Sequence, residues 1–252
     1  MDPRWYEQVR EIERNHWWFA GRRRILSAVL ERLDVRAESI LDVGCGSGTN
    51  LELLGERFSR GIIHGIDIDR ESLRHCARHR PTRVAQADLM HLPFRSGCFD
   101  LVCALDAIEH VPDDETALRG LHRVCRSGGT LLATVPAFDF LWGNVDRVGH
   151  HFRRYTRREL TDVIERSGFT VRFVRYFNTA LFPAIAGIRL AARLFSPRDA
   201  MDGEKVRTDF DLVKSGPLNA VLARVFGAEA SWLGWSPPFG VSLVCVAQRR
   251  AG

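Results

Sequence analysis

The sequence predicts an α/β fold in which a mainly parallel sheet lies between layers of helices. Three observations lead to this class. Short apolar runs alternate with stretches whose apolar residues have helical spacing, which is typical of parallel strands joined by helices. The 252 residues are 45% hydrophobic and 27% charged, enough for one domain with a substantial core. This composition excludes a disordered or fibrous protein.

Five strands are expected before residue 136, each followed by a turn or a helix. Two helices precede them in residues 4–33, because Ile25, Leu26, Val29 and Leu33 fall on one helical face. The expected strands are 39–43, 61–66, 83–86, 99–105 and 129–135, and the helices between them are 49–58, 70–79 and 114–125.

The pattern changes after Val135. Residues 136–155 are expected to form a long loop rich in aromatic residues and histidine. A helix at 157–167 follows, with Thr156 and Glu159 as a capping box and Gly168 at its end.

Two further strands are expected at 170–178 and 241–248. The long excursion between them has helical patterns at 181–195 and 217–227, and such an excursion is usually functional. The amphipathic helix at 181–195 is interpreted as a lid, a homodimer surface, an interfacial membrane contact or a helix packed on the domain.

The composition also bears on partners and compartment. The 36 basic residues include only two lysines, Lys205 and Lys214, so 34 are arginine. This preference indicates a GC-rich bacterial source rather than a nucleic-acid surface. The six cysteines form no C-x-x-C pair, which favours a reduced, cytoplasmic compartment. Neither a secretory signal nor an apolar run of about 18 residues is present, so no transmembrane segment is expected.

The strongest functional signal is the stretch Ile40-Leu41-Asp42-Val43-Gly44-Cys45-Gly46-Ser47-Gly48-Thr49. Its alternate glycines allow the backbone to turn tightly against a ligand. The spacing is neither the dinucleotide pattern G-x-G-x-x-G nor a P-loop. Asp42, just before the first glycine, would repel a pyrophosphate and suits a cationic ligand.

This stretch resembles the most specific motif of the class I S-adenosylmethionine-dependent methyltransferases. Four further stretches are similar to motifs of that family in order and spacing, namely GIDID at 65–69, ADLMHLPF at 87–94, FDLV at 99–102 and RVCRSGG at 123–129. The resemblance covers residues 38–135. It implies a Rossmann-like seven-stranded sheet of order 3-2-1-4-5-7-6, with N-terminal helices, an antiparallel last strand and a helical insertion between strands 6 and 7.

One methyltransferase domain is therefore expected over residues 1–252. Its parts would be an N-terminal helical cap at 1–37, the core sheet at 38–178, the insertion or lid at 179–240 and the last strand at 241–252.

The resemblance implies S-adenosylmethionine as cofactor and S-adenosylhomocysteine as product. Asp42 would hold the methionine ammonium, directly or through water, and Asp67 would accept both ribose hydroxyls. Asp69 is the alternative to Asp67, although the N-cap of the following helix suits it better. The expected cofactor-binding residues are Asp42, Gly44, Cys45, Gly46, Gly48, Asp67, Ile68, Asp88, Leu89 and Leu105.

The adenine ring would lie between Ile68 and Leu105. Asp88 would accept its exocyclic amine, with Leu89 offering its backbone. The alternative for Asp88 is a simple turn residue.

The acceptor side begins after the fourth strand, with the pattern Asp106-x-x-Glu109-His110. His110 is interpreted as a general base, with a packing or positioning role as the alternative. The pattern is similar to the E-x-x-E-H that can hold a divalent metal in ubiquinone-biosynthesis and small-RNA methyltransferases. Asp106 replaces the first Glu and shifts that ligand, so the expectation is no metal, with a divalent ion as the alternative.

The loop at 142–156 holds a second cluster, D-x-x-x-x-H-x-R-R-Y. It resembles a bacterial methyltransferase subgroup linked to glycan or secondary-metabolite pathways. His151 is interpreted as a base, Tyr155 as a hydrogen-bond donor, and Arg153 with Arg154 as a clamp for an anionic acceptor. The alternative has the arginines pairing with acidic neighbours and Tyr155 closing the core.

The N-terminal stretch His16-Trp17-Trp18-Phe19 also resembles that subgroup. Some of these aromatic residues are expected to cap the pocket, with Arg22 or His16 near the methionine carboxylate, or else to form a hydrophobic plug. The catalytic residues expected are His110, His151 and Tyr155, and the substrate-binding residues are Trp18, Arg22, Asp106, Asp146, Arg153 and Arg154.

The function predicted is transfer of a methyl group from S-adenosylmethionine to an oxygen or nitrogen of a small molecule, such as a sugar or a secondary-metabolite intermediate. A cofactor-binding protein used for sensing or for non-methylating chemistry is one alternative. A nucleic-acid methyltransferase is the other, disfavoured because Leu105-Asp106-Ala107-Ile108 stands where an N-P-P-Y-like tetrapeptide would be expected.

Overall fold

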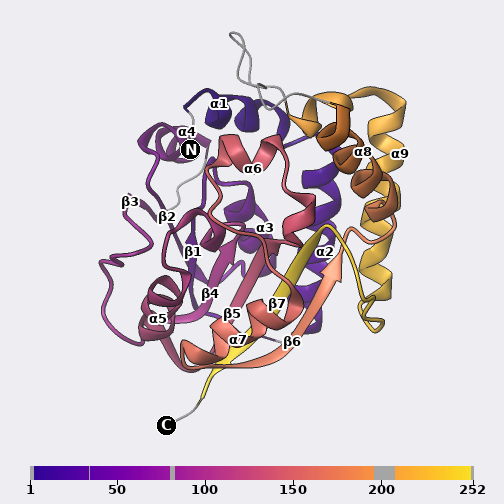
Figure 1. Ribbon diagram of the computed structural model, residues 1–252. Helices are drawn as coiled ribbons and strands as arrows, with labels where there is room; N and C mark the ends of the chain where they lie inside the picture. Colours follow the sequence, from indigo (N-terminus) through magenta and orange to yellow (C-terminus); the bar gives the residue numbers. More distant parts are fainter. Residues whose placement is uncertain (1–2, 34, 80–82, 196–207, 251–252) are drawn as a thin grey trace.

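A single seven-stranded sheet organises the molecule (Figure 1). The computed structural model describes residues 3–33, 35–79, 83–195 and 208–250. The strand order is β3-β2-β1-β4-β5-β7-β6, and β7 is antiparallel to both of its neighbours, β5 and β6. The predicted order and the antiparallel last strand are thereby confirmed. The strands are β1 (Ser39–Val43), β2 (Ile62–Asp67), β3 (Arg83–Gln86), β4 (Phe99–Leu105), β5 (Cys125–Pro136), β6 (Phe169–Phe177) and β7 (Ser242–Arg249).

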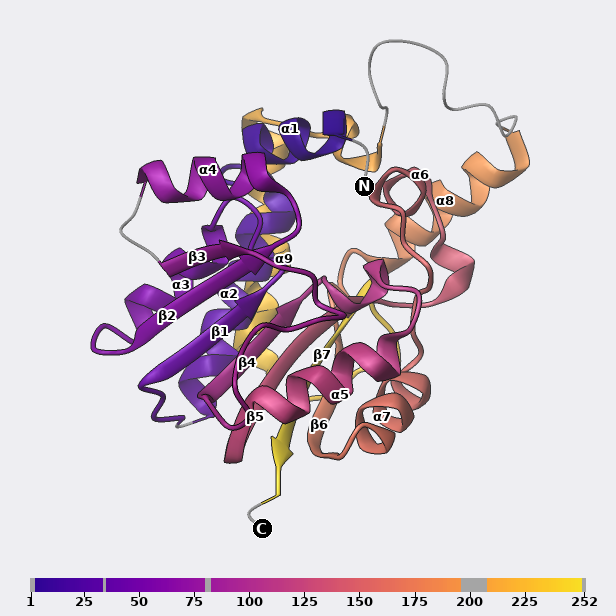
Figure 2. The same cartoon turned by 90° about the vertical axis from the view of Figure 1, so that its left-hand side faces the viewer.

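Helices cover both faces of the sheet (Figure 2). Helices α2, α3 and α9 contribute to the hydrophobic cluster on one face, and α5 and α7 to the cluster on the other. The α-helices are α1 (Pro3–Ile12), α2 (Trp17–Arg32), α3 (Thr49–Arg57), α4 (Arg70–His79), α5 (Asp114–Val124), α6 (Asn144–Gly149), α7 (Arg157–Arg166), α8 (Phe182–Phe195) and α9 (Gly216–Ala228). Short 3-10 turns occur at η1 (Ile108–His110), η2 (Asp139–Leu141), η3 (Asp209–Leu212) and η4 (Glu229–Trp232).

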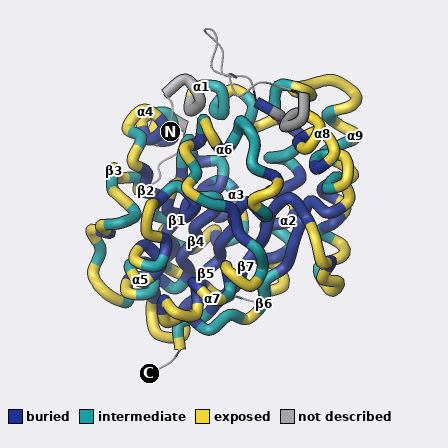
Figure 3. The backbone as a smooth tube through the Cα atoms, in the orientation of Figure 1, coloured by how far each residue is buried: buried dark blue, intermediate teal, exposed yellow. Residues whose placement is uncertain are grey.

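The central strands are buried on both faces, as the dark tube in Figure 3 shows. Successive side chains of a strand point to opposite faces, so Ile40 packs in the α2 cluster while Leu41 packs in the α5 cluster. This double burial explains why these strands appear in the sequence as continuous apolar runs.

The segment between β5 and α7 corrects one expectation. Residues 136–155 were expected to be a loop, but they contain η2 and the short helix α6. The Asp146 carboxylate accepts a hydrogen bond from the Gly143 N–H at 2.7 Å and so caps α6. His150 ends the helix in the left-handed conformation, with φ of 54°. A helix of six residues is too short to show a periodic apolar pattern.

Helices α8 and α9 lie in the expected insertion between β6 and β7. Helix α9 packs on α2, where Phe226 contacts Trp17 with ring centroids 6.1 Å apart. Residues 196–207 of the predicted insertion, and Lys205 among them, lie outside the described residues. In the described part of the chain, no helix is both long and apolar enough to cross a membrane.

Candidate active site

A cavity of about 730 Å³ opens where the parallel strands end. Its lining comes from the segments after β1, β2, β3 and β4, from α1 and the first turns of α2, and from the region of α6 and α8. Figure 2 shows the carboxyl ends of the strands rising towards α1, α4, α6 and α8. Ligands of open α/β sheets bind at this edge.

The glycine loop forms one wall of the cavity. The N–H groups of Gly44 and Cys45 both donate to the Ile66 carbonyl, at 2.8 and 3.0 Å, which fixes the loop to the end of β2. Gly46 has φ of +53°, and a Cβ there would meet nothing within 4 Å. Its backbone conformation therefore favours glycine, while the open space beside it leaves room for a ligand.

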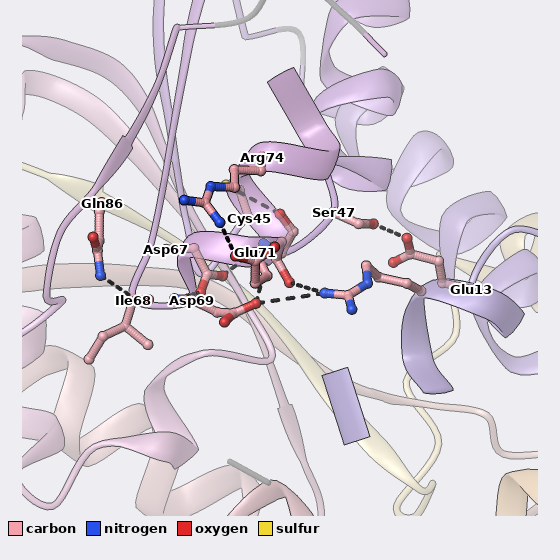
Figure 4. Close-up of polar contacts among 12 residues, drawn as sticks. Glu13, Cys45, Ser47, Asp67, Ile68, Asp69, Glu71, Arg74 and Gln86 are labelled. Carbon is pink, nitrogen blue, oxygen red and sulfur yellow. Dashed lines mark hydrogen bonds and ion pairs between the residues drawn. The ribbon is translucent and has the colours of Figure 1, made fainter. Parts of the chain in front are cut away.

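Asp67 is held at the end of β2 by backbone donors. Its carboxylate accepts hydrogen bonds from the N–H groups of Gly46 and Asp69, each at 2.8 Å (Figure 4). Burial raises the pKa of Asp67, and these two hydrogen bonds oppose the shift. Asp69 instead accepts from the Ser72 N–H at 2.8 Å, which confirms it as the N-cap of α4. Asp67 lines the cavity and Asp69 does not.

The residues predicted to bind adenine all reach the cavity. Ile68, Asp88, Leu89 and Leu105 all line the cavity. Ile68 is 64% exposed, and its carbonyl accepts a hydrogen bond from Gln86 at 3.0 Å (Figure 4). One oxygen of Asp88 accepts from the Met90 N–H at 2.8 Å, so Asp88 is a turn residue that also faces the cavity.

Asp42 lies beneath the cavity rather than on its wall. It is fully buried, and neither of its carboxylate oxygens has a hydrogen-bond partner among the described residues. Burial raises its pKa to about 8, against the opposing charge of Arg22. The expected contact with an ammonium group stays a prediction, and this placement favours its water-mediated form. Gly48 is the other predicted cofactor residue that does not line the cavity.

Arg22 joins α2 to the ends of the strands. Its guanidinium donates to Asn50 at 3.1 Å and to Thr134 at 3.2 Å, and it forms an ion pair of 2.6 Å with Asp106. It also lies 5.5 Å from the centre of the Trp18 ring. Arg22, Asp106 and Trp18 all line the cavity, and their binding of substrate stays a prediction.

Two histidines meet at the acceptor end. The ring centroids of His110 and His151 are 4.5 Å apart, and both side chains line the cavity. The His110 Nδ1 lies 2.7 Å from the Gly149 carbonyl, and the His151 Nδ1 lies 2.8 Å from Asp146. Burial, together with the neighbouring His151, lowers the pKa of His110 to about 3, so His110 is neutral near pH 7.

Asp146 is the buried anchor of this loop. It accepts two hydrogen bonds of 2.9 Å from Arg154 in addition to the one from His151. Burial opposes its ionisation, but the hydrogen bonds from His151 and Arg154 outweigh burial and hold the pKa of Asp146 well below its usual range. Arg154 lines the cavity, and its guanidinium forms an ion pair with Asp146.

Three residues predicted for the acceptor side do not line the cavity, namely Asp146, which is fully buried, Tyr155 and Arg153. The Tyr155 hydroxyl donates to Asp114 at 2.7 Å inside the core. Arg153 forms an ion pair of 2.9 Å with the same Asp114. Neither side chain lines the cavity. This geometry departs from the expected acceptor contacts and favours the alternative, in which Tyr155 closes the core and Arg153 pairs with an acidic neighbour.

The structure also brings residues to the cavity that the sequence did not single out for it. Glu13 is 7% exposed and accepts hydrogen bonds from Ser47 and Thr49 of the glycine loop (Figure 4). No local pattern links residue 13 to residue 47. Glu109 is fully buried in the wall beside His110. Its position in the Asp106-x-x-Glu109-His110 pattern was the available signal, but that pattern was interpreted mainly through its histidine.

Comparison with known proteins shows which proteins parts of this chain are similar to. Residues 41–133 match the family described as "Methyltransferase domain". The chain is 30% identical over 164 residues to a Mycolicibacterium smegmatis protein named as a probable S-adenosylmethionine-dependent methyltransferase, covering 63% of this chain and 61% of the relative. It is 37% identical over 117 residues to methyltransferase GfsG of Streptomyces halstedii, covering 43% of this chain and 41% of the relative. The chain thus spans less than two thirds of the length of these relatives.

A solved structure matches almost the whole fold. It is a chain of the complex between the Haloferax volcanii Trm112 methyltransferase activator and a methyltransferase. It aligns with a TM-score of 0.63 and 18% identity, covering 98% of this chain and 95% of that one. At this identity the likeness concerns the fold, including the strands that bear the cavity.

Proposed function

We propose that this chain is a class I S-adenosylmethionine-dependent methyltransferase that transfers a methyl group to an oxygen or nitrogen of a small molecule; the match of residues 41–133 to a methyltransferase domain supports this proposal. The observation that carries the proposal is that one cavity is lined both by Asp67 with the glycine loop and by the His110–His151 pair. The cofactor supplies a methyl carbon bound to a sulfonium and leaves as S-adenosylhomocysteine. The protein's task is to align the acceptor and to accept its proton.

At the cofactor end, the assignment rests on complementary hydrogen-bonding groups. Asp67 presents a carboxylate already oriented by the N–H groups of Gly46 and Asp69. Such a carboxylate accepts hydrogen bonds from a ribose diol. Ile68 and Leu105 offer apolar surfaces for the adenine ring.

At the acceptor end, His151 is the better placed proton acceptor. An Nδ1–H that donates to Asp146 leaves the Nε2 lone pair available, and Asp146 is itself held by Arg154. His110 has its pKa lowered to about 3, so it is a weak base and serves better to position the acceptor and His151.

The lining favours an acceptor with apolar or aromatic surface. Trp18, Phe19 and Phe210 contribute rings to the cavity, and their centroids lie 4.9–5.7 Å apart. Such a wall packs well against a planar or lipid-like group. A secondary-metabolite intermediate therefore suits the cavity better than a bare anion, since Arg154 is already paired with Asp146.

Calorimetry with S-adenosylhomocysteine tests the cofactor end. The wild-type chain is expected to bind it, and Asp67→Asn is expected to weaken binding at least about tenfold, because hydrogen bonds to a charged carboxylate contribute about 1.5–3 kcal/mol. Asp162→Asn, at a half-exposed carboxylate paired with Arg158 on α7, is the matched control and should bind as the wild type does. Absence of heat with both the methyl donor and its product would overturn the proposal.

Product release tests the acceptor end. Incubation with S-adenosylmethionine and a panel of hydroxylated and aminated aromatic acceptors should yield S-adenosylhomocysteine. His151→Gln should slow that release without changing cofactor affinity. Binding of the cofactor with no product from any acceptor class would instead favour a sensor or a non-methylating enzyme.

A further inference from the structure

One side of the molecule concentrates exposed apolar side chains. Of the thirteen large apolar side chains that are exposed in the described part of the chain, nine lie between residues 188 and 239. Helices α8 and α9 share this side, which is on the right in Figure 1 and faces away from the viewer in Figure 2. We refer to the exposed residues of 182–191 and 212–239 as the α8–α9 surface. Such a concentration marks an interaction surface, whereas single exposed apolar residues do not.

Helix α8 has its charged residue inside and its apolar residues outside. Arg189 is buried and donates to the Leu141 carbonyl at 2.6 Å. Arg189 and Ile185 line the cavity, whereas Ile188 and Leu190 are exposed on the outer side. A helix that faces water usually has the opposite arrangement. The exposed residues of 182–191 are all uncharged, namely Pro183, Ala184, Gly187, Ile188, Leu190 and Ala191.

Helix α9 has apolar side chains on its outer side as well as on its inner side. Leu222 and Phe226 belong to the hydrophobic cluster that also contains α2. Leu218, Val221 and Val225 are exposed, and their spacing of i, i+3 and i+7 places them in one stripe. Packing on α2 therefore leaves a second apolar stripe of α9 uncovered by the described residues.

Two tryptophans extend the surface beyond α9. Trp232 and Trp235 are both exposed, and their ring centroids are 6.5 Å apart. Phe239 is exposed a few residues later. Tryptophan is enriched where water meets lipid, because its ring is apolar while its N–H is polar.

The charge of the α8–α9 surface is positive. Among its exposed residues Lys214 and Arg224 are basic, and none is acidic. The nearest carboxylate along the chain is that of Asp211, which is half-buried and forms an ion pair with Lys214.

Helix α2 adds cations at the edge of this surface. A Cβ at Gly227 would lie 2.6 Å from the Arg24 side chain, and one at Gly234 would lie 3.8 Å from the Arg32 guanidinium. Both arginines are exposed. Glu31 is the one exposed carboxylate of α2, so cations outnumber carboxylates around the apolar residues in the described part of the chain.

We propose that the α8–α9 surface docks on the anionic surface of a lipid bilayer. Its apolar side chains would enter the boundary between headgroups and acyl chains, and its cations would lie among the anionic headgroups. The competing occupant is a second copy of this chain. A symmetric dimer would place the patch against itself and so bring like charges together, whereas an anionic bilayer is complementary in charge.

The docked surface lies next to the cavity. Ile185 and Arg189 line the cavity from the inner side of α8, while the outer side of the same helix belongs to the docking surface. An acceptor with an apolar chain would then reach the cavity from the bilayer instead of from water. This use rests on the proposed function, whereas docking itself does not.

Vesicle flotation of the full-length chain tests the docking surface. Vesicles of phosphatidylcholine are compared with vesicles of an equimolar mixture of phosphatidylcholine and phosphatidylglycerol. The wild type should bind the mixed vesicles at least about tenfold more tightly than the neutral ones, because each basic residue near an anionic surface strengthens binding. This difference should shrink as salt rises.

Two substitutions on the surface are paired with matched controls elsewhere. Ile188→Ser should weaken binding to the mixed vesicles at least about fivefold, because it removes an apolar side chain from the docked side. Its control is Ile62→Ser at the beginning of β2, since Ile188 and Ile62 are 51% and 46% exposed.

The charge is tested in the same way. Arg224→Gln should weaken binding to the mixed vesicles about fivefold and leave binding to the neutral vesicles unchanged. Arg158→Gln, at an exposed arginine on α7, is its control. The four substituted side chains are exposed, so thermal unfolding of each variant should match that of the wild type.

Three results would overturn the docking surface. These are absence of wild-type binding to the mixed vesicles, equal binding to mixed and neutral vesicles, and equal binding by the wild type, Ile188→Ser and Arg224→Gln. Light scattering that finds a dimer, converted to a monomer by Ile188→Ser, would assign the surface to a second copy instead.

Calorimetry with S-adenosylhomocysteine tells the two proposals apart. Retained cofactor binding without vesicle binding would confine the failure to the docking surface. Vesicle binding without cofactor binding would leave the docking surface in place and remove the proposed function.

Discussion

Three buried carboxyl groups, those of Asp42, Glu13 and Asp146, each lie in a different electrostatic setting. Burial raises the pKa of Asp42 to about 8 and that of Glu13 to about 7, while the hydrogen bond from Thr49 lowers the latter in part. In Asp146 the same burial penalty is outweighed by Arg154 and His151. The ionisation of a buried carboxyl group therefore depends on which donors face it.

Glu13 should make the stability of the protein depend on pH. Its folded-state pKa of about 7 lies above the usual 4.5, so its stabilising contribution is fully present below about pH 4.5 and is lost as pH rises through 7. The shift corresponds to about 3 kcal/mol. In urea unfolding across this range, Glu13→Gln should become more stable than the wild type by up to that amount at pH 8, with little difference at pH 4.

The exposed carboxyl group of Glu31 on α2 supplies the control for this experiment. Glu31→Gln should give a pH profile parallel to that of the wild type. If the Glu13→Gln profile is parallel as well, the pKa of Glu13 is not raised by burial in the folded protein.

At the scale of single residues, hydrogen-bond partners that are close in the sequence were easier to predict than partners that are far apart in it. Asp69 was correctly predicted as the N-cap of α4, because that role depends on a residue three positions away. Tyr155 was not placed, because its partner Asp114 is 41 residues away and nothing local indicates that contact. The same limit applies to Glu13 and Ser47, which come from segments 34 residues apart.

At the scale of elements, the packing of α9 on α2 holds the N-terminal segment against the cavity. Gly21 makes this close approach possible, because a Cβ at that position would lie 2.1 Å from the Phe226 ring. Trp17, one turn earlier on α2, contacts the same ring. The position of the aromatic cavity wall therefore depends on the spacing between the two helices.

Gly21→Ala should therefore destabilise the protein, although alanine favours helices. Overpacking of a core costs about 1–3 kcal/mol, which exceeds the gain of up to about 1 kcal/mol in helix propensity. Gly187→Ala on α8 is the matched control, because a Cβ there meets nothing within 4 Å, and it should stabilise by about 0.5–1 kcal/mol. Chemical denaturation measures both changes.

A second substitution checks the cause. Phe226→Leu should recover part of the stability that Gly21→Ala loses, since it removes ring atoms from the crowded position. If Gly21→Ala proves as stable as Gly187→Ala, the helices can separate at no cost and Gly21 does not set their spacing.

The elements themselves were predicted well where their patterns are long. The capping box of α7 confirms the one read from Thr156 and Glu159, with hydrogen bonds in both directions. Helix α6 escaped prediction because its six residues are too few for a periodic pattern. Its role in presenting His151 depends on Asp146, whose contact with Arg154 is tertiary.

At the scale of the whole molecule, some of the positive charge is engaged by carbonyl groups of the chain itself. Arg123 donates to the carbonyls of Leu92 and Phe94, and Arg249 donates to those of His122 and Cys125. Together with the 31 acidic residues, these internal contacts argue against a continuous basic surface.

The chain should therefore bind RNA weakly. In a mobility-shift experiment with tRNA, no complex is expected at 150 mM salt and micromolar protein, and any complex formed at low salt should disappear steeply as salt rises. A complex that survives physiological salt would contradict this prediction and revive a nucleic-acid substrate.

The overall topology was predictable because it followed from a resemblance spread over five motifs, of which three lie at the ends of strands and two at the beginnings of β4 and β5. The strand order and the antiparallel β7 are confirmed. The cavity could be located from the three motifs at residues 40–49, 65–69 and 87–94, since these lie at the carboxyl edge of the sheet. Which side chains meet across it could not be derived, because Glu109 and His151 approach each other only through the path of the loop that contains α6.

The position of β7 between β5 and β6 also constrains the order of assembly. The edge strand β6 hydrogen-bonds to β7, yet the chain reaches β7 only after passing through α8 and α9. Strand β6 (residues 169–177) therefore pairs only with a strand that comes later in the chain. Completion of the sheet is thus a long-range closure step, and the helices of the intervening excursion must find their places before or together with it.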